Sequence, residues 1–109
     1  MDENTTLRAL AALSQKTRLD VFRLLVKAGF EGMLAGEIGE SLNVRQNTMS
    51  TNLSILMNAG LIKNERQGRT VRYFADYDAM RGLLSFLMDD CCNGRPEICE
   101  GVFDEISCS

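Results

Sequence analysis

The chain has 109 residues, of which 45% are apolar and 25% are charged. This length allows one domain with its own core, and the composition excludes intrinsic disorder. No apolar run approaches the roughly 18 residues that cross a bilayer, and the N-terminus MDENTTLRAL lacks the basic and then apolar order of a signal peptide. We therefore expect a cytoplasmic protein with no membrane partner.

The net charge of −3 conceals two halves of opposite sign. Residues 1–75 hold ten Lys/Arg and seven Asp/Glu, whereas residues 76–109 hold two and eight. Because the local distribution of charge attracts phosphate, the acidic total does not exclude nucleic-acid binding.

Apolar residues at helical spacing predict two helices, over residues 7–13 and 19–28, with Gly29 ending the second. A short helix over residues 34–42 should follow and lead into a turn at Asn43. With the next helix, this arrangement predicts a helix-turn-helix.

That next helix, in the segment RQNTMSTNLSILMNAG, ends in a helix stop at residues 58–60 and has two unlike faces. Met49, Leu53, Leu56 and Met57 line one face. The other face carries amides and hydroxyls without charge, namely Gln46, Asn47, Ser50, Thr51 and Ser54. Such groups hydrogen-bond to base edges and phosphates, so the face is predicted to read the DNA major groove. The alternative is a polar surface that faces only solvent.

The β-branched and aromatic residues on both sides of Gln67–Gly68 favour extended backbone and predict a two-stranded hairpin. Its basic residues are Lys63, Arg66, Arg69 and Arg72, against the single acid Glu65. A basic hairpin directly after a helix-turn-helix is expected to be a wing that contacts phosphate or the minor groove, through Arg66 and Arg69. Charged edges also discourage aggregation of exposed hairpins, which is the alternative explanation.

The last predicted helix, over residues 77–92, carries apolar residues three and four apart, a stripe typical of packing between helices. The stripe either packs on the domain's own core or joins two subunits. Since small DNA-binding domains commonly read two half-sites, we expect a homodimer. The expected interface contains Leu7, Leu10, Tyr77, Met80, Leu84 and Leu87.

These elements predict a mainly α-helical protein with a β-hairpin, a dimeric winged helix-turn-helix. The domain should cover residues 1–92, with its last helix ending in a cysteine pair, and be followed by a cysteine-containing tail over residues 93–109.

The segments LSQKTRLDVFRLLV and MSTNLSILMNAGLIKNERQGRTVRYFA resemble the ArsR/SmtB family, over roughly residues 5–92. The resemblance implies a dimeric bacterial repressor, not an enzyme, that leaves double-stranded operator DNA when a metal, metalloid or other inducer binds. Many arsenic sensors of the family carry a cysteine pair in the third helix, which is absent here. Zinc, nickel and cobalt sensors typically use histidine, and this chain has none.

All four cysteines follow residue 90, in and after the segment DDCCNGRPEICE. Cys91, Cys92 and Cys99 are similar to the Cys-Cys pair and third cysteine of a branch of arsenic-responsive repressors, which implies As(III) or Sb(III) as inducer and no organic cofactor. Thiolates prefer such soft ions, and three sulfurs suffice for a trivalent metalloid. Asn93–Gly94 should end the helix, and Pro96 should bend the chain so that Cys99 returns over the pair.

Neighbouring Asp89 and Asp90, at a helix C-terminus, favour neutral thiols and therefore argue for ligands over nucleophiles. The cysteines also allow a cadmium or lead site, thiol oxidation, or no sensing role. Cys108 is a further candidate ligand, since a fourth sulfur suits a tetrahedral ion. A function of another class is a thiol metal buffer that does not bind DNA. Nothing in the sequence predicts catalysis.

Overall fold

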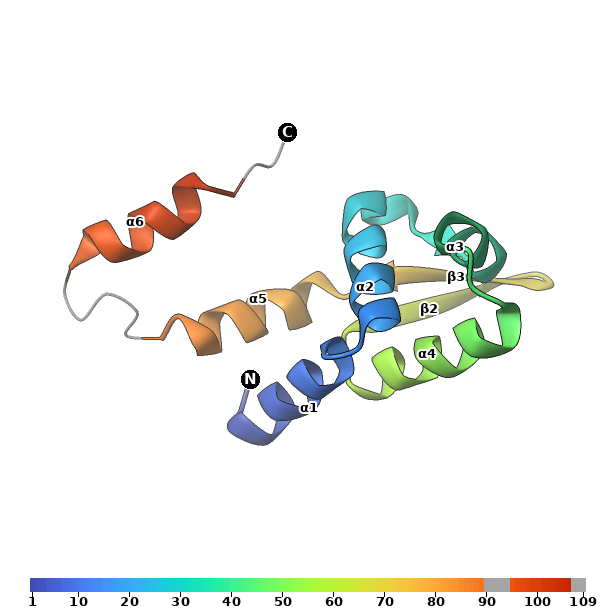
Figure 1. Ribbon diagram of the computed structural model, residues 1–109, viewed down its shortest axis with the longest axis horizontal. Coiled ribbons are helices and arrows are strands. Elements are labelled where there is room, and N and C mark those ends of the chain that lie inside the picture. Colours follow the sequence, from blue (N-terminus) through green and yellow to red (C-terminus); the bar gives the residue numbers. More distant parts are fainter. Residues whose placement is uncertain (90–94, 107–109) are drawn as a thin grey trace.

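The computed structural model describes residues 1–89 and 95–106 (Figure 1). Its elements are α1 (Glu3–Leu13), α2 (Lys16–Ala28), the 3₁₀ turn η1 (Gly29–Glu31), β1 (Met33–Leu34), α3 (Ala35–Leu42), α4 (Gln46–Asn58), β2 (Ile62–Gln67), β3 (Thr70–Ala75), α5 (Tyr77–Leu87) and α6 (Pro96–Asp104). The expected fold class, mainly α-helical with a β-hairpin, is confirmed.

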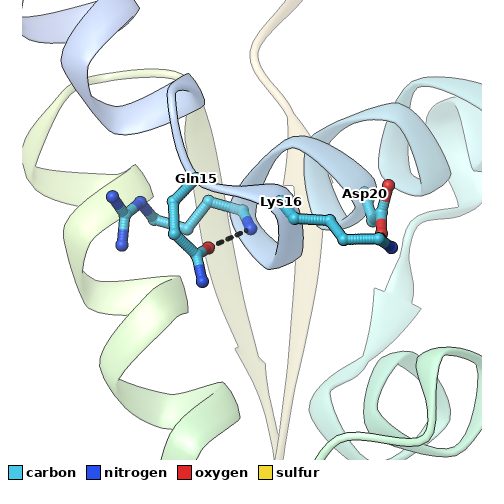
Figure 2. Close-up of polar contacts among 4 residues, drawn as sticks. Gln15, Lys16 and Asp20 are labelled. Atoms are coloured by element: carbon cyan, nitrogen blue, oxygen red, sulfur yellow. Dashed lines mark hydrogen bonds and ion pairs between the residues drawn. The ribbon is translucent and has the colours of Figure 1, made fainter.

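Side-chain caps fix where the first two helices begin. The Asp2 carboxylate accepts the backbone N–H of Thr5 at 2.7 Å ahead of α1. Ahead of α2, Gln15 Oε1 accepts the backbone N–H of Arg18 at 2.9 Å, and Lys16 pairs with Asp20 at 2.7 Å (Figure 2). These caps satisfy N–H groups that have no partner within the helix.

The core is formed mainly by α1 to α4, with contributions from β2 and β3. Its buried side chains are Ala9, Ala12, Val21, Phe22, Leu25, Ile38, Met49, Leu53, Leu56, Leu61, Ile62 and Ala75. In α1, small residues face this core, whereas Leu7 and Leu10 point outward and are exposed. Small residues let α1 approach α2 and α4 closely and leave its larger apolar side chains uncovered.

The sheet has three antiparallel strands in the order β1-β3-β2. In the wing hairpin, Ile62 lies opposite Ala75 and Gln67 lies opposite Thr70. The prediction of two strands missed β1, in which Met33 pairs with Tyr73. A strand of two residues is too short to show alternation in the sequence.

The C-terminal part differs from its prediction in two ways. Helix α5 ends at Leu87, with Met88 as its C-cap, before the expected end at residue 92. Pro96 begins a further helix, α6, which was not predicted, because proline is tolerated at the first helical position. The predicted helix stop at Asn93–Gly94 lies outside the described residues, and the return of Cys99 over the cysteine pair stays a prediction. Within residues 1–89 and 95–106, no helix is long and apolar enough to cross a membrane.

Candidate nucleic-acid interface

A tight turn between α3 and α4 positions the candidate reading helix. Asn43 adopts a left-handed conformation with φ of 55°, and the Val44 N–H donates to the Gly39 carbonyl at 2.9 Å. A Cβ atom on Gly39 would lie 2.5 Å from Gln46 Nε2. A side chain at position 39 would therefore displace the Gln46 amide, and the predicted turn at Asn43 is confirmed.

The two faces of α4 are as different as the sequence predicted. Met49, Leu53 and Leu56 are buried in the core. The five polar side chains of the other face are all exposed: Gln46, Asn47, Ser50, Thr51 and Ser54. The outward face of α4 therefore presents hydrogen-bonding groups without carrying charge.

Three of these side chains also make local contacts. Gln46 Nε2 lies 3.4 Å from the Ala35 carbonyl, which holds its amide against the start of α3. Asn47 Oδ1 accepts the Thr48 N–H at 2.8 Å, and the Thr51 hydroxyl donates to the Asn47 carbonyl at 3.2 Å. The Asn47 amide nitrogen keeps its two donors and the Thr51 oxygen keeps acceptor capacity for an external partner.

The wing presents two arginines to solvent. Gly68, with φ of 66°, occupies the first position of a two-residue turn, and Arg69 occupies the second. Arg66 and Arg69 are exposed, and neither has an ion-pair partner in the part of the chain that the structure describes. Their charges are therefore available to an anion.

Arg72, which belongs to the same cationic group in the sequence, has a structural role instead. Its Nε donates to Gln67 Oε1 at 3.1 Å and its guanidinium donates to the Glu31 carbonyl at 3.2 Å. These contacts hold β3 against the turn that follows α2. Among the basic residues of the wing, Arg66 and Arg69 are therefore exposed, whereas Arg72 is held by hydrogen bonds within the protein. The sequence pattern did not predict this difference.

A buried amide on the inner face of α4 was not predicted from the sequence. Asn52 is 6% exposed and lies among apolar neighbours, and its Oδ1 accepts a hydrogen bond from Arg18 at 3.3 Å. The signal was present in the sequence as a polar residue between Met49 and Leu53. Only the fold shows that its partner comes from α2.

The predicted dimer stripe divides into two parts. Tyr77 and Met80 are half-buried against the core, and the Tyr77 hydroxyl donates to the Val26 carbonyl at 2.8 Å. Four members of the stripe are exposed, namely Leu7, Leu10, Leu84 and Leu87. Phe86, which the prediction omitted, is exposed on α5 as well. The part of the stripe that is left open to a partner is therefore the end of α5 together with α1, which lies beside it (Figure 1).

The predicted thiol site lies outside the described structure. Cys91, Cys92 and Cys108 are not among the described residues, and Cys99 lies in α6 but its side chain is not described. Among the side chains that are described, no group of three carboxylates or thiols could hold a metal ion. The three-cysteine site therefore stays a prediction.

Comparisons with known proteins agree with this fold. A family model for a helix-turn-helix domain matches residues 13–65. The uncharacterized HTH-type transcriptional regulator YbzH of Bacillus subtilis (strain 168) is 33% identical over 88 residues, which cover 70% of this chain and 88% of that protein.

Two solved structures extend the comparison. One is the homodimeric winged helix-turn-helix DNA-binding domain of a possible ArsR-family transcriptional regulator from Mycobacterium bovis. It is 26% identical with a TM-score of 0.65, over 80% of this chain and 81% of that one. An ArsR-like transcriptional regulator from Rhodococcus sp. RHA1 has a TM-score of 0.72 at 21% identity over 95% of both chains, which is a likeness of fold alone.

Proposed function

This chain belongs to the helix-turn-helix transcriptional regulators, with an ArsR-like winged domain, and from this premise we propose that it is a homodimeric repressor of double-stranded operator DNA. One observation carries the proposal. The outward face of α4 holds five exposed, uncharged polar side chains, and the adjacent wing holds two exposed arginines without ion-pair partners among the described residues.

The two parts of this surface suit different parts of DNA. Amides and hydroxyls recognise base edges in the major groove, where each base pair shows a distinct pattern of donors and acceptors. Asn47, with two donors directed away from its local contact, is the side chain of α4 best suited to read a base. Arg66 and Arg69 supply the charge that binds phosphate irrespective of sequence.

A dimer would present this surface twice. Leu84 and Leu87 are exposed on α5 beside the outward leucines of α1, and burial of such side chains against a second copy is favourable. Paired reading helices reach successive major grooves when their centres are about 34–36 Å apart. We therefore expect the operator to contain two related half-sites.

The DNA-binding proposal is tested by selection of DNA duplexes from a random-sequence library with the native protein. A repressor should enrich one motif and bind it with a Kd of roughly 10⁻⁸–10⁻¹¹ M at physiological salt. Asn47→Ala should relax the base preference at one position of each half-site, whereas Lys16→Ala, at the start of α2 and away from the outward face of α4, should not. If no motif is enriched, the proposal is wrong.

The proposal extends to the inducer, which we assign to trivalent arsenic or antimony. The support is chemical: Cys91, Cys92 and Cys99 stand close together in the sequence, thiolates prefer soft ions, and the chain has no histidine. The pair follows soon after α5, whose exposed end belongs to the expected dimer interface. A change there that alters the spacing of the two reading helices would weaken DNA binding by about 5- to 150-fold, the usual range of allosteric coupling.

Serine substitutions test the inducer separately from DNA binding. Cys91→Ser, Cys92→Ser and Cys99→Ser should each keep operator affinity but abolish release by arsenite, and Cys108→Ser should keep both. Parallel titrations with cadmium, lead and a thiol oxidant identify the inducer if arsenite has no effect. If arsenite still releases all three variants from operator DNA, the metalloid site lies elsewhere. If the native protein binds arsenite but no DNA, it is a thiol metal buffer.

A further inference from the structure

Arg18, near the start of α2, joins three helices. Its Nε donates to the Ala12 carbonyl at the end of α1 at 2.7 Å, and its Nη1 donates to Asn52 Oδ1 on α4 at 3.3 Å. The backbone of Arg18 is itself fixed by the Gln15 side chain at the N-terminus of α2 (Figure 2). One guanidinium group thus connects the first helix with the candidate reading helix.

The acceptor in this contact is unusual for its position. Asn52 is buried on the face of α4 that otherwise contributes Met49, Leu53 and Leu56 to the core. The hydrophobic effect has no preferred direction, whereas a hydrogen bond weakens steeply as its distance and angle change. A buried amide without its partner is costly, so the bond to Arg18 favours one rotation and depth of α4.

A second arginine supports the same arrangement. Arg8 on α1 donates to the Asn58 carbonyl at the end of α4 at 2.7 Å. Asn52 and Asn58 are six residues apart, which corresponds to about 9 Å along a helix. Both arginines line an open groove of about 380 Å³ between α1 and α4. Neither forms an ion pair with any described residue, so their hydrogen bonds serve to hold α4 against α1 and α2.

We propose that Arg18 and Asn52 are positioning residues for DNA recognition, a role that rests on the proposed function. They set the rotation and depth of α4 relative to α1, and the bases that Asn47, Ser50 and Thr51 meet depend on that setting. Neither residue lies on the exposed reading face. Because α1 also carries the outward leucines of the expected dimer interface, the same contact relates the position of each reading helix to the arrangement of the two subunits.

Binding measurements with the full chain test the inference. Fluorescence anisotropy compares a duplex selected by the native protein with a scrambled duplex of equal length, over a range of salt concentrations. Arg18→Ala and Asn52→Ala should each reduce the preference for the selected duplex by roughly tenfold, and the double variant should be no worse than the worse single variant. The dependence on salt should not change, since neither side chain binds phosphate.

Two kinds of control separate positioning from simple loss of stability. Asn52→Asp keeps an acceptor for Arg18 and should retain the preference, which provides a readout if the alanine variants fail to fold. Arg23→Ala removes an exposed cation of α2 that has no hydrogen-bond partner among the described side chains, and it should match the native protein. Thermal melting of every variant shows which of them are folded.

Three results would overturn the inference. The first is an unchanged preference in folded Arg18→Ala and Asn52→Ala, and the second is an equal loss in Asn52→Asp. The third is a salt slope reduced by about one for Arg18→Ala, which would mean direct contact with phosphate. If the native protein selects no duplex at all, the proposed function fails, and this role in recognition fails with it.

Discussion

Residues 1–89 and residues 95–106 are built in opposite ways. In the first region, four helices and the sheet enclose a continuous apolar core. In the second, every residue whose burial the structure describes is exposed, including Ile98 and Val102 of α6 and Ile106, which follows it. The first region therefore has the packing of a stable DNA-reading domain. The sequence that joins the two regions carries a cysteine pair, Cys91 and Cys92.

The largest expected effect is on the free energy of unfolding, and it is tested by the same substitution of an isoleucine in each of the two regions. Ile38 is 0% exposed and Ile98 is 49% exposed. Ile38→Ala should lower the free energy of unfolding by about 2–5 kcal/mol through lost burial and a cavity, whereas Ile98→Ala should change it by less than about 0.5 kcal/mol. Urea denaturation measures both. A cost for Ile98→Ala close to that for Ile38→Ala would show that α6 is part of the stable core.

The next effect concerns removal of the second region. A chain that ends at Asp89 should fold, with the melting temperature of the full chain, and bind the selected operator. It should lose release by arsenite, a change worth about 1–3 kcal/mol of coupling. Gel shifts with and without arsenite provide the measurement. Loss of operator binding in the truncated chain would instead assign the tail to the dimer or to DNA contact.

A smaller effect separates basic residues of the wing. Arg66→Ala and Arg69→Ala should each weaken binding to all DNA by roughly fivefold and reduce the salt slope by about one, because each removes one phosphate contact. Arg72→Ala should leave the slope unchanged and lower stability, since Arg72 is bound to Gln67 and Glu31. Equal salt slopes for all three variants and the native protein would remove the wing from the DNA interface.

The smallest effect is a pH dependence at the start of α1. Hydrogen bonds from Thr5, chiefly from its backbone N–H, hold the pKa of Asp2 below its ordinary value. A lowered pKa in the folded state contributes stability above the unfolded pKa of roughly 4, and this contribution is lost as the pH falls through the folded pKa. The melting temperature of Asp2→Asn should therefore lie slightly below that of the native chain at pH 6, and the difference should disappear as the pH falls through the folded pKa. A constant difference would exclude this titration.

Local patterns predicted much of the fold and of the reading face. The apolar and polar positions of α4, the end of α2 at Gly29 and the hairpin turn at Gly68 all depend on residues close together in the sequence. Their physical causes, helical periodicity and the freedom of glycine at positive φ, act over a few residues. The structure accordingly agrees with these predictions.

Features that depend on distant partners could not be predicted. Arg72 belongs to the same basic group as Arg66 in the sequence, but in the fold its guanidinium donates to the Glu31 carbonyl. Tyr77 belongs to the predicted dimer stripe, but its hydroxyl donates to the Val26 carbonyl within the same chain. The Arg18 contact to Asn52 spans two helices. The helix that begins at Pro96 was not predicted, because proline prevents continuation of a preceding helix but is tolerated at the first position of a new one.

The most direct test of the central claim is a nuclear magnetic resonance titration of the labelled full chain with its selected duplex. We expect backbone signals to change most at Asn47, Ser50 and Thr51 on α4 and at Gly68 and Arg69 on the wing, while those of residues 95–106 stay near their free positions. Changes confined to α6, or no changes at any concentration of duplex, would contradict the claim that α4 and the wing bind DNA.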